Sequence, residues 1–395
     1  MQDNVKITSL SWEARLVRVL SISVLTLITL AELGALFRIP VLTLPGALAT
    51  TLTSWFIILI FASVVAYSWT GSLRARPWTV VVAFMTLFTL FGSVLIEISL
   101  VRLARKNGIP VSILETFMLP HSGAHNRGTF VPYTTFNGAR VNLVIYRPRL
   151  GAVGHPSPVL IYVHGGGWIS GSADARHADF NWFADQGWLV ISVDYTLSTK
   201  DQHLWDVTHG QIACSMAWVG THAAQLGGDL SRLYMMGDSA GGNLAINASY
   251  MANADMLTSS CGGAVPHIRA VVAGYPVVDP AKFYKNPVPL YGNGARPMAG
   301  GYTGGAPEQY PERYRTISSF TYLTSGAPPT MIFVGEHDNL VPPEPTYEFA
   351  KLARSEGVCV ELIRIPYADH GFDVLPHTLG NQIFRNSSAN FMRQH

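Results

Sequence analysis

The sequence predicts an α/β domain with a mostly parallel central sheet, preceded by an N-terminal region of apolar helices. Over most of the chain, short continuous apolar runs alternate with longer helical patterns. Such runs are typical of strands that helices cover on both faces of a sheet. The first hundred residues instead contain long stretches without charge, in a chain that is 48% apolar and only 13% charged. The chain therefore combines two regions of different character.

Three apolar segments near the N-terminus are long enough to cross a bilayer. No charged residue occurs from Ile39 to Leu73 or from Pro77 to Ile96, and each stretch reaches the length of a membrane-spanning helix. The earlier segment, Leu16 to Phe37, contains Glu32 but still has the length of a span, and we expect it to form a third one. The alternatives are buried core helices or, for the first segment, a secretory signal peptide, although a clear cleavage site is lacking.

Three spans would place the two ends of the chain on opposite sides of a membrane. The basic residues before the first span and between the last two favour a cytoplasmic N-terminus; they are Lys6, Arg15, Arg18, Arg74 and Arg76. The basic residues at positions 102, 105 and 106 act in the opposite direction. We therefore expect a membrane protein whose C-terminal domain lies, by a small margin, on the non-cytoplasmic side.

The chain divides into a membrane region, 1–106, and an α/β domain, 107–395. The α/β domain starts with a predicted hairpin over 128–148, two alternating runs around an Asn-Gly turn. Six apolar runs follow and are expected to form strands: 158–164, 188–195, 231–237, 268–279, 329–338 and 358–367. The segment 280–325 is rich in Pro, Gly and Tyr without clear periodicity, and we expect it to form part of a cap over a functional site.

One serine lies in a glycine-rich turn at the end of an apolar run. The stretch "LYMMGDSAGGNLA" (233–245) places Ser239 in a G-x-S-x-G pattern, after a strand-like run and before a helix-like one. This is the setting of a nucleophile elbow, in which the serine backbone is strained and side chains in place of the glycines would collide with the adjoining strand and helix. We therefore predict a nucleophile rather than the capping serine of an ordinary turn.

Three further motifs offer the groups that would activate such a serine. "YVHGGGW" follows a predicted strand, and its glycines let backbone amides approach a ligand, while the amide of Ala240 would add another donor. "GEHDNLVPP" offers Asp338 and "YADHGFD" offers His370, each after a late strand. The chain order serine, aspartate, histidine is expected when three loops meet at the carboxyl edge of one sheet.

Taken in order, "HGGGW", "GDSAGGN", "GEHDNLV" and "ADHGF" resemble the motifs of the hormone-sensitive-lipase-like esterases and lipases, which have the α/β-hydrolase fold. The resemblance covers residues 131–393. It implies a nucleophile, an orienting acid, a base and three oxyanion donors: Ser239, Asp338, His370, and Gly165, Gly166 and Ala240. One departure concerns the strand ending in "VDY", which family members often continue with Arg and a proline–acid pair. Here "TLSTKDQ" follows, so the shape of that side of the pocket is open.

Several neighbouring residues have competing interpretations. Glu336 and Asp369 are rivals of Asp338, but the first is expected to end a strand and the second to point away from the histidine beside it. His164 and His337 are expected to be structural. The aromatic residues Trp168 and Tyr195 are candidates for lining the substrate pocket, and core packing is an equal alternative.

These features together predict a membrane-anchored serine hydrolase that cleaves carboxylic esters without a metal or organic cofactor. The position of the last span next to the catalytic domain favours lipophilic or acylated substrates. The alternatives are an amidase or arylformamidase, an acyltransferase with the same triad, or a non-catalytic binding protein on this fold. A net charge of +2 without a basic tract gives no reason to expect nucleic acid as a partner. Three scattered cysteines indicate neither a disulfide framework nor a zinc site, and nothing indicates an oligomeric state.

Overall fold

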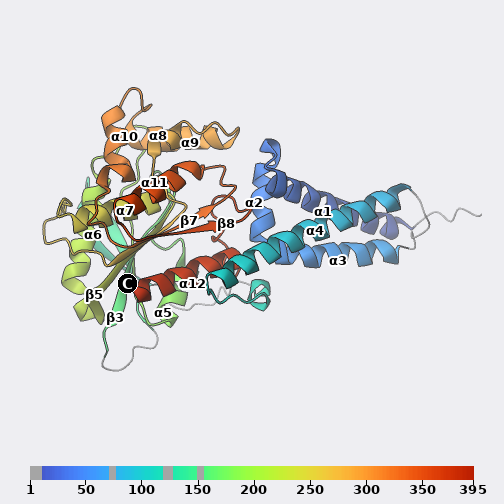
Figure 1. Cartoon of the computed structure of the whole chain (residues 1–395), viewed down its shortest axis with the longest axis horizontal. Coiled ribbons are helices and arrows are strands. Elements are labelled where there is room, and N and C mark those ends of the chain that lie inside the picture. The colour runs from blue at the N-terminus through green and yellow to red at the C-terminus, as the bar shows by residue number, and fades with distance from the viewer. Residues whose placement is uncertain (1–10, 71–76, 119–127, 149–154) are drawn as a thin grey trace, which may run out of the picture.

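The computed structural model describes residues 11–70, 77–118, 128–148 and 155–395 of the chain. An arm of N-terminal helices extends from one side of an α/β unit (Figure 1). The arm contains α1 (Trp12–Phe37), the 3-10 turn η1 (Pro40–Leu42), α2 (Thr43–Thr51), α3 (Thr53–Trp69) and α4 (Pro77–Lys106). The long helices α1, α3 and α4 pack against one another. A further 3-10 turn, η2 (Leu114–Phe117), follows the arm.

Two of these helices are long and apolar enough to cross a membrane, Trp12–Phe37 and Thr79–Lys106. The segment between them is broken, because Pro40–Thr51 and Thr53–Trp69 meet at 95°. The uncharged stretch from Ile39 to Leu73, which we expected to cross the membrane, is bent within its described residues, and it adds a third crossing if the bent pair is counted as one span. The physical reason is tertiary, since α2 folds back onto α1 with Gly46 so close to Gly34 that a Cβ on Gly46 would lie 2.8 Å from the Gly34 carbonyl carbon.

The α/β unit is built on one eight-stranded sheet in the order β1-β2-β4-β3-β5-β6-β7-β8. The first two strands form the predicted antiparallel hairpin, and β2 pairs antiparallel with β4. All pairings from β4 to β8 are parallel, so the mostly parallel sheet is confirmed. The bounds are β1 (Thr129–Phe136), β2 (Ala139–Tyr146), β3 (Ser157–Val163), β4 (Leu189–Val193), β5 (Gly228–Asp238), β6 (Ala270–Gly274), β7 (Thr330–Gly335) and β8 (Val360–Ile365).

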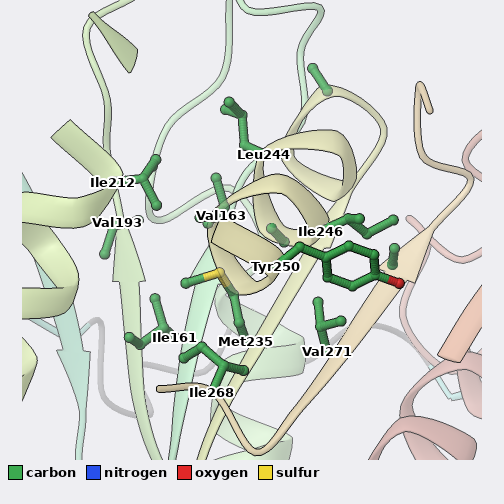
Figure 2. Packing of buried hydrophobic residues seen from close by; sticks show 14 of the residues in the cluster. Ile161, Val163, Val193, Ile212, Met235, Leu244, Ile246, Tyr250, Ile268 and Val271 are labelled. Atoms are coloured by element: carbon green, nitrogen blue, oxygen red, sulfur yellow. The ribbon is translucent and has the colours of Figure 1, made fainter. Parts of the chain in front are cut away.

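Helices cover both faces of this sheet. Successive residues of β3 point to opposite faces of the sheet and are buried on both: Ile161 belongs to the hydrophobic cluster on one face and Leu160 to the cluster on the other. The first face packs against α6 (Thr208–His222), α7 (Ala240–Asn253) and α11 (Glu344–Ser355). Figure 2 shows side chains of that cluster, with Met235 of β5 beneath Tyr250 of α7. The second face packs against α5 (His177–Asp185) and α12 (Leu379–Gln394).

The segment 280–325 is largely helical, although its sequence showed no clear period. It contains α8 (Pro280–Tyr284), α9 (Tyr291–Thr303), α10 (Pro311–Ile317) and the 3-10 turn η4 (Ser319–Tyr322). Glycines and Pro297 inside α9 lower its intrinsic helix propensity, so tertiary contacts decide its conformation. One such contact is the ring of Tyr302 stacked on that of Trp168, with centroids 4.8 Å apart. The segment therefore touches the "HGGGW" loop.

Two of the three cysteines form a disulfide that the sequence did not indicate. Cys214 in α6 pairs with Cys261, 47 positions further along the chain, with Cα atoms 5.4 Å apart. The loop between α7 and β6 folds back onto α6, and no local spacing announces that contact. Cys359 is exposed and free.

Candidate active site

Ser239 lies in a sharp turn between β5 and α7 at the carboxyl edge of the sheet. Its φ of 53° and ψ of −121° are unusual for a residue with a side chain. Neighbouring glycines make the turn sterically possible, because a Cβ on Gly237 would lie 2.4 Å from the Gly241 carbonyl oxygen. A Cβ on Gly241 would lie 2.2 Å from the carbonyl oxygen of Val163. The turn thus has the strand–turn–helix geometry expected from the sequence.

The structure brings His370 and Asp338 to Ser239 from the loops after β8 and β7. His370 Nε2 lies 3.0 Å from Ser239 Oγ, and His370 Nδ1 lies 2.8 Å from Asp338 Oδ2. The amides of Leu340 and Val341 donate to the other carboxylate oxygen of Asp338, at 3.0 and 2.8 Å. Because Asp338 accepts from Nδ1–H, the Nε2 lone pair of a neutral His370 faces the serine hydroxyl. This arrangement lets the imidazole remove a proton from Ser239.

The surroundings of His370 favour its protonated form. Burial alone would lower the pKa of His370, but the Asp338 carboxylate beside Nδ1 raises it, and the resulting pKa lies above the ordinary value. The ring of Tyr275 packs edge-on against the imidazole, with centroids 4.5 Å apart. Asp338 therefore favours the protonated imidazole, and Asp338 and Tyr275 together fix the orientation of the ring.

The two acidic rivals of Asp338 have other partners. Asp369 accepts hydrogen bonds from the amides of Asn339 and His370 and from the Asn339 side chain, so its carboxylate points away from the imidazole ring. Glu336 forms an ion pair with Arg364 at 2.8 Å. Of the three acids, only Asp338 contacts the imidazole of His370 within the described part of the chain.

The glycine loop differs from the expectation at one position. The amide of Gly165 donates to Asp238 Oδ1 at 3.0 Å, so it is not available as an oxyanion donor as predicted. Gly166 and Gly167 have φ values of 117° and 61°, which suit glycine. Their amides donate to no acceptor among the described residues. Ala240 begins α7, and the first amides of a helix have no acceptor within it. The amide of Gly167, which sequence reasoning did not name, is therefore a candidate donor in place of that of Gly165.

The residue before the nucleophile holds this loop in place. Asp238 Oδ1 also accepts a hydrogen bond from the Tyr162 hydroxyl at 2.5 Å, and Asp238 Oδ2 lies 4.0 Å from the Arg176 guanidinium. Arg176 is in turn 2.5 Å from the buried carboxylate of Asp373, in the loop after His370. The network joins the three loops behind the triad. No signal in the sequence announced it, because its members come from distant segments.

The two aromatic pocket candidates lie in the core. Trp168 is 1% exposed and stacks on Tyr302, and Tyr195 is 3% exposed. Tyr195 stacks on His164 with centroids 4.4 Å apart and donates to the His164 carbonyl at 3.0 Å. Their burial favours the core alternative over the pocket role. His164 supports the glycine loop, and His337 contacts the Ala35 carbonyl through Nδ1 at 2.7 Å.

A large cavity lies beside the glycine loop, between α9 and the chain after β4. Its volume is about 850 Å³, and its lining includes Ile169, Lys200, His203 and Arg296 together with several glycines. The described residues that line it do not include Ser239. The departure from the family pattern after "VDY" thus coincides with the wall of this cavity rather than with the triad.

Comparison with known proteins assigns the family. The sequence profile of the BD-FAE family matches residues 143–352, more than half of the chain. This chain belongs to the BD-FAE family. Among curated relatives, the chain is 29% identical over 288 residues to the esterase LipQ of Mycobacterium tuberculosis, covering 69% of this chain and 65% of LipQ. It is 31% identical over 224 residues to the carboxylesterase NlhH of the same species, and the match covers 54% of this chain and 66% of NlhH. The family expected from the motifs, an esterase/lipase α/β-hydrolase, is confirmed. The chain spans about half to two thirds of the length of the curated relatives that it matches.

Solved structures show the fold of the BD-FAE chain. The butyrate-bound esterase 2 of Thermogutta terrifontis has a TM-score of 0.55 and 24% identity, covering 68% of this chain and 94% of that chain. The tabun-phosphoramylated form has a TM-score of 0.56 and 22% identity, covering 70% and 97%. The likeness confirms the α/β-hydrolase fold.

Proposed function

We propose that this chain hydrolyses carboxylic esters through an acyl-enzyme intermediate on Ser239. The hydrogen-bonded series from Asp338 through His370 to Ser239 carries this proposal. Its geometry meets the requirement that a nucleophile have a base within hydrogen-bond reach and that a third group orient the base. The names of the matched relatives, an esterase and a carboxylesterase, give further support.

The chemistry uses groups of the chain and water. Ser239 Oγ attacks the ester carbonyl while His370 Nε2 takes its proton, and the resulting oxyanion would accept hydrogen bonds from the amides of Gly166, Gly167 and Ala240. His370 then protonates the departing alcohol, which leaves the acyl group on Ser239. Water attacks the acyl-enzyme while the same imidazole takes its proton; the imidazolium then returns this proton to Ser239 Oγ as the carboxylic acid is released. No step requires a metal or an organic cofactor, and the partner at the site is a small ester.

We also propose that α1, the bent pair α2–α3 and α4 anchor the chain in a membrane, with the α/β unit on the non-cytoplasmic side. The apolar length of α1 and α4 supports the anchor. The Cys214–Cys261 disulfide supports a non-cytoplasmic position of the α/β unit, because disulfides persist mainly in oxidising compartments.

The hydrolytic mechanism is tested with p-nitrophenyl esters of graded acyl length. We expect Ser239→Ala to lower kcat by about 10³-fold or more on every ester that the wild type cleaves, because the nucleophile is lost. Ser355→Ala, at an exposed position in α11, is the matched control and should keep the wild-type rate. Equal rates for wild type and Ser239→Ala would exclude the mechanism. The corresponding p-nitroanilides separate ester from amide cleavage.

A further inference from the structure

We propose that the active site takes its ester substrate from the bilayer itself, and that an apolar face of α2 rests in the lipid beside the site. We define the α2 face as Leu44 and Leu48 of α2 together with Val41 of the preceding 3-10 turn η1. The substrate class is an ester whose long hydrocarbon chain is dissolved in the membrane. The inference rests on the proposed ester hydrolysis and membrane anchor, and adds the route by which the substrate arrives.

The corner between α1 and α2 is attached to the loops that carry the acid and the base. His337, directly before Asp338, contacts the Ala35 carbonyl of α1 at 2.7 Å. Tyr291, at the start of α9, donates to Asp369 at 3.3 Å, and Thr43 of α2 lies near the Tyr291 hydroxyl. Asp369 directly precedes His370. The carboxyl edge of the sheet, where the triad lies, thus faces the corner, and Figure 1 shows β7 and β8 running toward α2.

The direction of α2 places it along a membrane surface. It meets α3 at 95°, so a helix arm that crosses the bilayer leaves α2 parallel to the bilayer plane, at the end of the arm next to the α/β unit. The stretch from Ile39 to Leu73, which includes α2, carries no charged residue. An uncharged helix in this position has no side chain that requires full hydration.

The two sides of α2 have opposite character. Thr43, Gly46 and Thr50 are buried, and Gly46 lies directly against the backbone of α1. The α2 face points the other way, with Val41 85%, Leu44 56% and Leu48 49% exposed. Exposing three large aliphatic side chains to water costs free energy, which insertion into lipid recovers at roughly 25 cal/mol per Å².

The bilayer is the occupant that the surroundings of this face favour. The face continues the apolar exterior of the arm, where Phe37 at the end of α1 is 63% exposed and Phe61 of α3 is 57% exposed. The exposed Arg38 lies between Phe37 and Val41 in the chain, and a long basic side chain at this place can reach the headgroups while its apolar neighbours lie in the lipid. A long-chain ester could then present its carbonyl to Ser239 while its tail stays in the membrane.

The test compares two substrates on the full-length protein in phosphatidylcholine vesicles. One is p-nitrophenyl butyrate in solution, and the other is p-nitrophenyl palmitate dissolved in the vesicles. We expect Leu44→Gln/Leu48→Gln to keep the wild-type rate on butyrate within twofold and to lose tenfold or more on palmitate. The matched control is Leu352→Gln, at a 41% exposed leucine of α11, which should change neither rate.

The outcomes separate this inference from the proposed function. Absence of Ser239-dependent butyrate hydrolysis in the wild type would reject ester hydrolysis itself. Wild-type hydrolysis of butyrate but not of vesicle-borne palmitate, or an unchanged palmitate rate in the double variant, would reject the membrane route alone. An equal loss on both substrates would also reject it.

A measurement independent of turnover locates the α2 face directly. A nitroxide is attached to Leu48→Cys in a Cys359→Ser background, and Leu352→Cys serves as the control. In vesicles we expect the label at position 48 to be accessible to oxygen and shielded from a water-soluble nickel chelate, and the label at position 352 to show the reverse. A water-accessible label at position 48 would overturn the proposal.

Discussion

Ser239 shows how a single residue depends on atoms that are remote in sequence. Its positive φ is tolerated because Gly237 and Gly241 remove the Cβ atoms that would strike the neighbouring backbone. In the proposed mechanism its hydroxyl depends on His370, which is 131 residues further along the chain and lies 3.0 Å away. The residue type and the turn are local properties, and the contact is a property of the sheet.

At the same scale, the raised pKa of His370 predicts a pH dependence. The neutral imidazole is the base, so kcat/KM should fall as the pH drops through a pKa that lies above the ordinary histidine value. Asp338→Asn removes the charge that raises this pKa while burial still lowers it. We therefore expect the acid limb to move to lower pH and kcat to drop by up to about 10⁴-fold, because the asparagine no longer holds the reactive tautomer.

The pH–rate profiles of wild type and Asp338→Asn measure both effects. Glu336→Gln is the control, since its carboxylate pairs with Arg364 and does not contact His370. An acid limb at the same pH in Asp338→Asn and wild type would show that Asp338 does not set the pKa of the base.

Among the elements, α2 differs most from its sequence expectation. The uncharged stretch from Ile39 to Leu73 has the length of a membrane span, but the close contact of Gly34 with Gly46 stabilises a separate short helix across α1. Hydrophobic length measures whether a segment can cross a membrane. It does not register a backbone-to-backbone contact between two helices, so the bend could not be read from composition.

This contact predicts a large effect of one substitution in α2. A side chain on Gly46 would meet the backbone of Gly34 and Ala35 at 2.8 and 2.9 Å, so Gly46→Val must separate the two helices. We expect the free energy of unfolding to fall by about 1–3 kcal/mol, measured by thermal unfolding in detergent. Gly294→Ala in α9 meets no atom within 4 Å and is the control. A Tm of Gly46→Val equal to that of the control would contradict the close packing.

On the scale of the whole molecule, a helix arm and an α/β-hydrolase unit meet at the carboxyl edge of the sheet. The Ala35 carbonyl of α1 contacts His337, next to Asp338, and α2 packs against α12 of the α/β unit. The Cys214–Cys261 disulfide lies within the α/β unit. This disulfide therefore serves as a chemical marker for the side of the membrane on which the α/β unit lies.

That marker gives a test of membrane sidedness in cells. When the protein is denatured directly from cells with a polyethylene-glycol maleimide and no reductant, we expect one mass addition, at Cys359. Prior reduction should give three additions, because it releases Cys214 and Cys261. Three additions without reductant would place the α/β unit in a reducing compartment and contradict the proposed side.

The sequence by itself determined the strand pattern, the hairpin, the elbow at Ser239 and the order of the acid and base motifs. These depend on local periodicity and on residue types at short spacing, which the chain displays directly. Only the tertiary structure decided that Gly165 donates to Asp238, that Trp168 and Tyr195 lie in the core, that Cys214 pairs with Cys261, and that α2 bends across α1. Each of these is a contact between segments that the sheet or the helix arm brings together. A pairing of this kind depends on the relative positions of packed elements, which no local pattern encodes.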